Sequence, residues 1–157
     1  MIPTSTQDAL TTELVEDEGE DFRVYDDDNG AYIARGSKLI GNPTIGVGRN
    51  LATNGISKAE SRMLLANDIE STWNELLPVL PWLPNLSTAR QVVILGIYFN
   101  TALHDPERFV KTGWPHFLAQ MEAGMWVLAA QNLSTSEPWA SEVGDRAIRY
   151  ASMVQDG

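Results

Sequence analysis

The chain has 157 residues, of which 43% are hydrophobic and 20% charged, a composition that is typical of a folded domain and excludes an intrinsically disordered segment. The absence of cysteine excludes disulfide bonds, thiolate zinc sites and a cysteine nucleophile. A formal net charge of −10 argues against a nucleic-acid partner, because binding to phosphates depends on clustered lysine and arginine.

Neither the first residues nor the most apolar segment of the chain predicts a targeting or membrane-spanning segment. Residues 1–8 contain no basic start and no apolar run of signal-peptide length, so we expect no export signal there. The most apolar segment, 91–99, is far shorter than the roughly 20 residues that a membrane span needs. We therefore expect a buried helix in this segment and no membrane insertion.

The first predicted element is a helix that Ser5 or Thr6 caps and that Gly19 ends. Glu18 falls four residues after Leu14 and continues the apolar stripe of this helix. We therefore expect Glu18 at the helix C-terminus and partly buried.

Between residues 22 and 48 the pattern changes to short β-type runs. These runs are residues 22–25, 31–34 and 44–47, and a turn is predicted at residues 28–30. The pattern predicts a small antiparallel sheet.

The remainder of the chain is predicted to be helical. Ser57 and Glu60 have capping-box spacing and open a long helix that ends before Pro78. Ser87 caps a strongly apolar helix that should form core. Shorter helices are predicted at residues 114–122, 125–133 and 145–154.

These elements predict an α+β chain, mostly α, in a single domain over residues 1–157. A small β-containing lobe is expected at about residues 20–56. A larger helical lobe is expected at about residues 57–157, packed with the N-terminal helix.

Carboxylates near the first helix suggest glycosidase chemistry, which requires one protonated acid and one ionised carboxylate in different environments. We expect the charged form of Glu18 to be disfavoured, because the residue falls at a helix C-terminus and is partly buried. A general acid requires this, since it must hold its proton. Asp26, Asp27 and Asp28 lie in or beside a polar turn, which favours ionisation. On spacing alone, a solvated helix end followed by an ordinary turn remains the simpler interpretation. A calcium loop is excluded, because the glycine has the wrong offset and the closing glutamate is absent.

Three motifs together favour the catalytic interpretation. They are Asp17-Glu18-Gly19, Tyr25-Asp26-Asp27 and Thr44-Ile45-Gly46-Val47-Gly48. In this set the chain resembles the phage-type lysozymes of glycoside hydrolase family 24, which have Glu-Gly, Tyr-x-Asp and Thr-Ile-Gly-x-Gly in the same order. The resemblance implies that Glu18 is the general acid, that Asp27 is the second carboxylate and that Thr44 helps to hold the attacking water.

Weaker matches extend the resemblance along most of the chain. Segments 55–57 and 64–69 look like the family's interlobe helix and the turn that enters it. Asn100 looks like part of its central helix, and Trp139 and Arg146 look like its C-terminal, substrate-side region. The resemblance therefore implies substrate-binding roles for Asn100, Trp139 and Arg146.

The chain departs from the family pattern in two places. Residues 34–42 form an inserted loop that contains Arg35 and Lys38, either as glycan contacts or, more simply, as residues that keep the loop solvated. Arg49 stands where many relatives have histidine, and we expect it to pair with Asp68 rather than to act in catalysis.

No metal or cofactor is predicted. His104 and His116 have no carboxylate spacing that suggests a metal site, so a loop residue and a helix-surface residue are expected. A serine-hydrolase elbow is absent from the sequence, as is a complete phosphate-binding glycine motif.

The resemblance implies an inverting peptidoglycan hydrolase that cleaves the β-1,4 bond between N-acetylmuramic acid and N-acetylglucosamine and lyses a host cell. The expected partner is a peptidoglycan glycan strand, bound by a monomer. The acidic charge favours a thin Gram-negative wall over a teichoic-acid-rich one. Without an export signal, the protein is expected in the host cytoplasm before it reaches the periplasm, although virion association fits the sequence equally well. Two alternatives stay open, a lytic transglycosylase that yields anhydro products and a catalytically silent wall-binding virion protein.

Overall fold

The computed structural model describes residues 2–100 and 104–157, and the chain divides into two compact units. Unit 1 is Met1–Arg62 and unit 2 is Met63–Gly157, so the division falls inside one long helix. The chain is α+β and mostly helical, as the sequence predicts, with a small antiparallel sheet. Among the described residues, no helix is both long and apolar enough to span a membrane.

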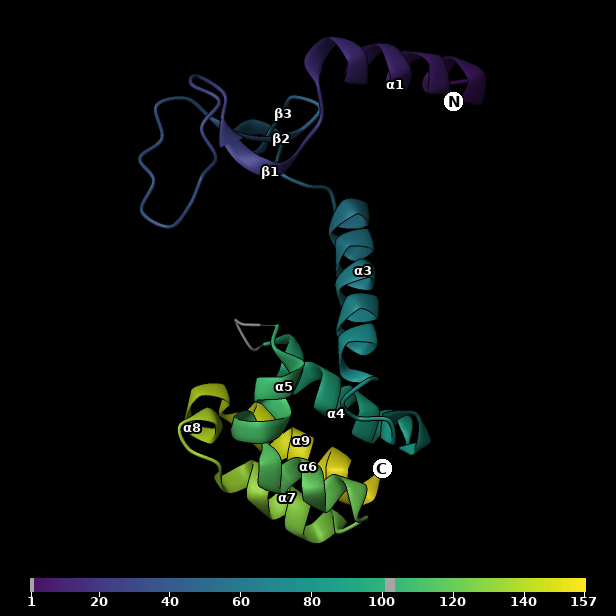
Figure 1. Ribbon diagram of the computed structural model, residues 1–157, viewed down its shortest axis with the longest axis vertical. Helices are drawn as coiled ribbons and strands as arrows, with labels where there is room; N and C mark the ends of the chain where they lie inside the picture. The colour runs from purple at the N-terminus through teal and green to yellow at the C-terminus, as the bar shows by residue number, and fades with distance from the viewer. Residues whose placement is uncertain (1, 101–103) are drawn as a thin grey trace. The chain divides into compact units, whose positions relative to one another are not determined.

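Unit 1 holds the sheet (Figure 1). Its strands are hydrogen-bonded in the order β1-β2-β3, and both neighbouring pairs are antiparallel. The elements of this unit are α1 (Thr4–Glu18), β1 (Asp21–Asp26), β2 (Pro43–Gly46), β3 (Arg49–Asn50) and α2 (Leu51–Asn54).

The two ends of α1 are specified differently. The helix begins at Thr4, so the prediction that Ser5 or Thr6 caps it is wrong. Pro3 precedes the helix with extended backbone, and its carbonyl accepts the N–H of Thr6, so no side-chain cap forms. Gly19 ends the helix as predicted, with a φ of 72° and its N–H donated to a backbone carbonyl one turn earlier.

The expected strand at residues 31–34 is reduced to one bridge, between Tyr25 and Tyr32. The segment turns at Gly30, where φ is 69°, and the N–H of Ile33 reaches the carbonyl of Val24. The chain then leaves the sheet to form the inserted loop, and it returns as β2, which pairs with β1. Strand β3 was not predicted.

The start of α3 (Lys58–Leu76) confirms the predicted capping box. The backbone N–H of Glu60 donates to the hydroxyl of Ser57 at 3.2 Å, and the N–H of Ser57 donates to the Glu60 carboxylate at 2.7 Å. Arg49 pairs with this same carboxylate at 2.6 Å and donates to the carbonyl of Gly55, so the expected pairing with Asp68 is wrong. The reciprocal cap holds Glu60 beside β3, within reach of the guanidinium.

Unit 2 is a helical assembly around one apolar core. Helix α7 packs against α6 and α9, and α4 packs against α9. Side chains with less than 2% exposure fill the centre, among them Phe117, Met121 and Leu133. Its elements after α3 are η1 (Leu83–Asn85), α4 (Thr88–Phe99), α5 (Pro106–Arg108), η2 (Phe109–Gly113), α6 (Pro115–Glu122), α7 (Trp126–Thr135), α8 (Trp139–Val143) and α9 (Asp145–Asp156).

The helix predictions in unit 2 are largely confirmed. Ser87 caps α4, with its side chain accepting the N–H of Arg90, and the predicted shorter helices correspond to α6, α7 and α9.

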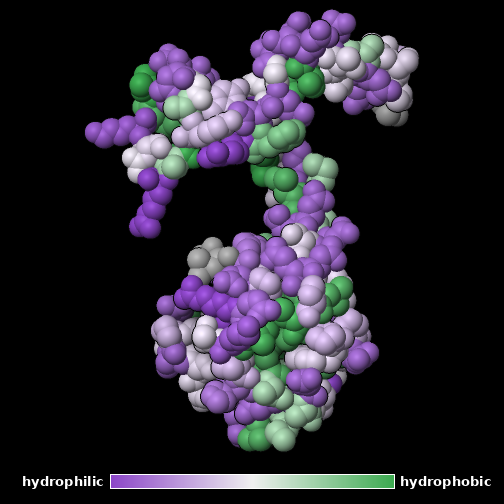
Figure 2. Space-filling model, viewed as in Figure 1, coloured by the Kyte–Doolittle hydropathy of each residue, from purple (hydrophilic) through white to green (hydrophobic). Residues whose placement is uncertain are grey.

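Part of the surface is apolar, and Figure 2 shows hydrophobic residues on the exposed side of α3. Met63, Leu64 and Ile69 of α3 are each about half exposed.

Candidate active site

The proposed second carboxylate and the threonine are connected through one residue of the inserted loop, Asn42. The backbone N–H of Asn42 donates to one carboxylate oxygen of Asp27 at 2.6 Å, and its side-chain amide donates to the other oxygen at 3.2 Å. The hydroxyl of Thr44 donates to the backbone carbonyl of Asn42 at 3.3 Å. Asp27, directly after β1, and Thr44, in β2, are therefore linked within unit 1.

The exposure of these two side chains differs, and this difference suits different roles. Asp27 is exposed, with N–H donors on both carboxylate oxygens. Thr44 is 3% exposed and pairs with Tyr25 of β1 on one side and Asn50 of β3 on the other. Since its proton is directed at Asn42, the Thr44 hydroxyl can act toward a further partner only as an acceptor.

The neighbouring carboxylate, Asp26, is buried at the end of β1 with 3% exposure. It accepts backbone N–H groups from Ile40 at 2.7 Å, Gly41 at 2.9 Å and Asp28 at 3.1 Å. The N–H of Ile40 lowers the pKa of Asp26 most strongly, and those of Asp28 and Gly41 lower it further against the opposing effect of burial. Because these donors occupy its oxygens, Asp26 is a structural acceptor, whereas Asp27 and Asp28 are exposed.

The structure does not give Glu18 the partly buried environment expected from its helical stripe. Glu18 is exposed at the last position of α1, and Leu10 and Leu14 on the same stripe are 48% and 43% exposed. Within unit 1, no residue of α1 is buried. The position of Glu18 at the C-terminus of α1 is confirmed.

Strand β1 separates the two proposed catalytic carboxylates along the chain. Glu18 precedes Asp21, where β1 begins, and Asp27 directly follows its last residue. Six strand residues span about 16 Å at about 3.3 Å per step. Glu18 and Asp27 therefore lie beyond opposite ends of β1.

Two of the predicted substrate-binding residues meet in unit 2 around Tyr150, which the sequence analysis missed. The ring of Trp139 lies 6.4 Å from that of Tyr150, and the guanidinium carbon of Arg146 lies 6.0 Å from the Tyr150 centroid. Trp139 also packs edge-on against Trp114 at 5.2 Å. Trp139 therefore packs against the core of unit 2, and it is also a candidate ligand contact.

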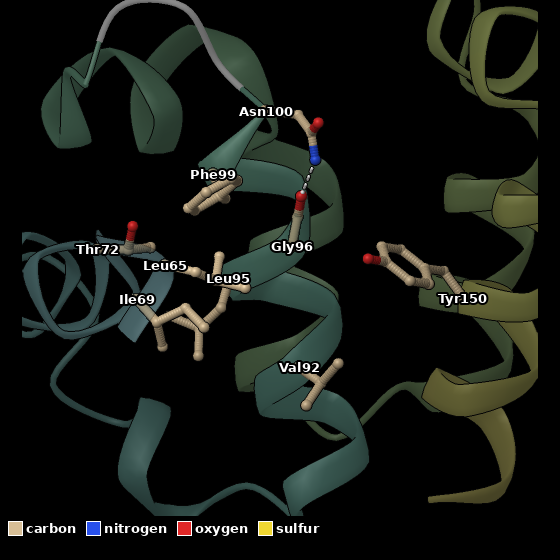
Figure 3. Close-up of a pocket in the computed structure, with 9 residues that line it drawn as sticks. All are labelled: Leu65, Ile69, Thr72, Val92, Leu95, Gly96, Phe99, Asn100 and Tyr150. Atoms are coloured by element: carbon tan, nitrogen blue, oxygen red, sulfur yellow. Dashed lines mark hydrogen bonds between the residues drawn. The ribbon is translucent and has the colours of Figure 1, made fainter. Parts of the chain in front are cut away.

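The third predicted residue, Asn100, lines a pocket of about 300 Å³ together with Tyr150. In Figure 3, the Asn100 amide points back to its own helix and donates to the carbonyl of Gly96 at 2.6 Å. Most of the pocket wall is apolar, and it comes from α3 and α4. The remaining lining residues are Leu65, Ile69, Thr72, Val92, Leu95, Gly96 and Phe99.

The predicted site residues thus form two groups, each within its own unit. Glu18, Asp27 and Thr44 lie in unit 1, while Asn100, Trp139 and Arg146 lie in unit 2. Within the described residues, no cluster of three or more histidines and carboxylates has metal-binding geometry. His104 instead lies beside Glu75, with 3.5 Å between its Nδ1 atom and the carboxylate.

The sequence does not identify Asn42 or Asp26 as site residues, for different reasons. Asn42 ends the inserted loop, and its contacts reach back 15 residues to Asp27. The motif spacing selects Asp27, and not Asp26, as the second carboxylate. A glycine before the asparagine is the one local signal, since a Cβ at Gly41 would collide with the carboxylates of Asp26 and Asp27.

No family model matches this chain, and no curated protein sequence matches it.

Proposed function

We propose that the chain is a peptidoglycan hydrolase with a lysozyme-like fold, a muramidase that cleaves the β-1,4 bond between N-acetylmuramic acid and N-acetylglucosamine. The observation that supports this most directly is the linkage of Asp27 to Thr44 through Asn42. An exposed carboxylate and a threonine oxygen are the acceptors that a nucleophilic water needs in order to be oriented and deprotonated.

In the proposed mechanism, the Glu18 carboxyl donates its proton to the leaving glycosidic oxygen. Asp27 accepts a proton from the attacking water, whose second hydrogen bond goes to the lone pairs of the Thr44 hydroxyl. The water attacks the anomeric carbon of N-acetylmuramic acid from the face opposite the leaving group, which inverts the configuration. Inversion requires about 6.5 to 9.5 Å between the two carboxyl groups, which is room for that water and is shorter than the length of β1 that separates Glu18 from Asp27 along the chain.

The biological role proposed for this activity is lysis of a bacterial host by a phage endolysin. The substrate is the glycan strand of peptidoglycan, and the enzyme acts as a monomer after passing from the host cytoplasm to the cell wall. The net charge of −10 supports a Gram-negative wall as the target, because anionic wall polymers would repel the protein.

Mass analysis of the products tests the reaction type. Purified Gram-negative peptidoglycan digested in ¹⁸O-labelled water should release muramic acid reducing ends that carry the heavy oxygen. Products with 1,6-anhydro ends would identify a lytic transglycosylase instead, since that enzyme closes the sugar without using water. Binding to the glycan with no released fragments would support a silent wall-binding protein.

A further inference from the structure

The carboxylate of Asp26 has a role that the proposed reaction does not use. It lies at the end of β1, directly before Asp27, and is 3% exposed. Aspartate is seldom this buried unless its oxygens are paired. The contacts that pair them identify what Asp26 holds in place.

Three consecutive residues at the end of the inserted loop donate their backbone N–H groups to two consecutive aspartates. Ile40 and Gly41 donate to Asp26 at 2.7 and 2.9 Å, and Asn42 donates to Asp27 at 2.6 Å. Hydrogen bonds to an ionised acceptor are shorter and stronger than those between neutral groups. The run of three amides therefore fixes the loop end on the pair of carboxylates.

Close approach of the backbone at Gly41 is part of the same arrangement. A Cβ atom there would meet the carboxylate oxygens of Asp26 and Asp27 and the Cβ of Asp28. Only glycine allows the loop to lie this close to β1. The distance between the loop and the strand is thus set by Gly41 on one side and by the Asp26 carboxylate on the other.

We propose that Asp26 is a positioning residue, which holds the end of the inserted loop so that Asn42 stays hydrogen-bonded to Asp27. Asp26 itself contacts no substrate and acts through Ile40, Gly41 and then Asn42. The catalytic consequence rests on the proposed muramidase function, whereas the structural consequence, the placement of Asn42 on Asp27, does not.

Asp28 provides a matched control, because it lies in the same turn but is exposed and donates to Asp26 only through its backbone. In Asp26→Asn, one carboxylate oxygen becomes an NH₂ group that faces a backbone donor, so the acceptor for Ile40 or Gly41 is lost. Asp28→Asn leaves every contact of the Asp26 carboxylate in place.

The experiment measures amide hydrogen exchange of Asn42 by NMR in the full chain, together with kcat and KM on soluble peptidoglycan fragments. We expect Asp26→Asn to speed exchange at Asn42 about tenfold or more. We also expect it to lower kcat roughly 10- to 100-fold with little change in KM, because the general base is misplaced rather than the substrate released. Asp28→Asn should match the wild type in both measurements.

Gly41→Ala provides a second test from the loop side if Asp26→Asn does not fold, and the same two changes are expected. Unchanged exchange at Asn42 in the folded variant would overturn the proposal, and so would faster exchange with kcat at the wild-type level. If the wild type itself cleaves no glycan, the proposed function fails. The exchange at Asn42 then still decides whether Asp26 holds that residue on Asp27.

Discussion

The hydroxyl of Tyr98 in α4 donates a hydrogen bond of 2.6 Å to the carboxylate of Glu75 in α3. Tyr98 is completely buried, whereas the Glu75 side chain is 30% exposed. Burial, followed by the interaction with Glu75, raises the pKa of Tyr98, and the bond from Tyr98 is the main cause that lowers the pKa of Glu75. This contact connects two helices of unit 2.

Replacing Tyr98 with phenylalanine should destabilise unit 2 by about 1 kcal/mol at pH 7. The estimate lies below the roughly 1.5 to 3 kcal/mol of hydrogen bonds to charged groups, because solvent reaches Glu75. Urea unfolding of the wild type and Tyr98→Phe measures the difference. Glu70→Gln, at an exposed position of α3, the helix that carries Glu75, should leave the urea midpoint unchanged.

The effect of Tyr98→Phe should depend on pH in one direction. The pKa of Glu75 is lowered from its ordinary value of 4.5, so its contribution is fully present above about pH 4.5 and is lost as the pH falls through the lower, folded-state pKa. Unfolding curves at pH 6 and pH 3 should therefore show a larger stability difference at pH 6. A difference that grows on acidification would contradict this account of the contact.

The capping box at the start of α3 predicts a second stability effect. Ser57→Ala removes the side-chain acceptor for the N–H of Glu60 and should cost about 1 kcal/mol. Ser61→Ala, one turn further along and exposed, serves as the control. Thermal unfolding of both variants tests the prediction, and equal effects would show that the cap contributes nothing specific.

The sequence predicted the features that depend on neighbouring residues. The stop at Gly19, the cap at Ser87 and the box between Ser57 and Glu60 each involve residues within one helical turn, where spacing alone determines which groups meet. These local predictions are confirmed in the structure.

Features that depend on chain segments far apart were not predictable in the same way. Asn42 reaches Asp27 across 15 residues, and nothing in the intervening loop sequence specifies how that loop closes. The burial of α1 was inferred from a stripe whose leucines are about half exposed. The predicted partner of Arg49 is wrong because α3 carries several carboxylates, and the capping box places that of Glu60 beside the guanidinium.

The Arg49 correction itself predicts a contrast between two variants. Glu60→Gln weakens both the pair with Arg49 and the contact with Ser57, so it should lower the Tm slightly, as half-exposed ion pairs contribute little. Asp68→Asn should leave the Tm unchanged. A fall in Tm for Asp68→Asn equal to that of Glu60→Gln would indicate that Arg49 pairs with Asp68 in solution.

The side-chain amide of Asn42 should affect turnover more than stability. Asn42→Ala keeps the backbone N–H on Asp27 but removes the donor to its second oxygen, so we expect kcat to fall about tenfold. Asn54→Ala, at an exposed position at the end of α2, is the control and should retain wild-type kcat. Steady-state kinetics on peptidoglycan fragments provides the comparison.

The most direct test of the proposed muramidase is the clearing of a Gram-negative peptidoglycan suspension by the wild type, Glu18→Gln and Glu20→Gln. The Glu20→Gln variant changes the charge equally at an exposed residue two positions away. The account predicts that the wild type and Glu20→Gln clear the suspension, and that Glu18→Gln is at least about a hundredfold slower while remaining folded by circular dichroism. Clearing by Glu18→Gln at the wild-type rate would contradict the assignment of Glu18 as the general acid.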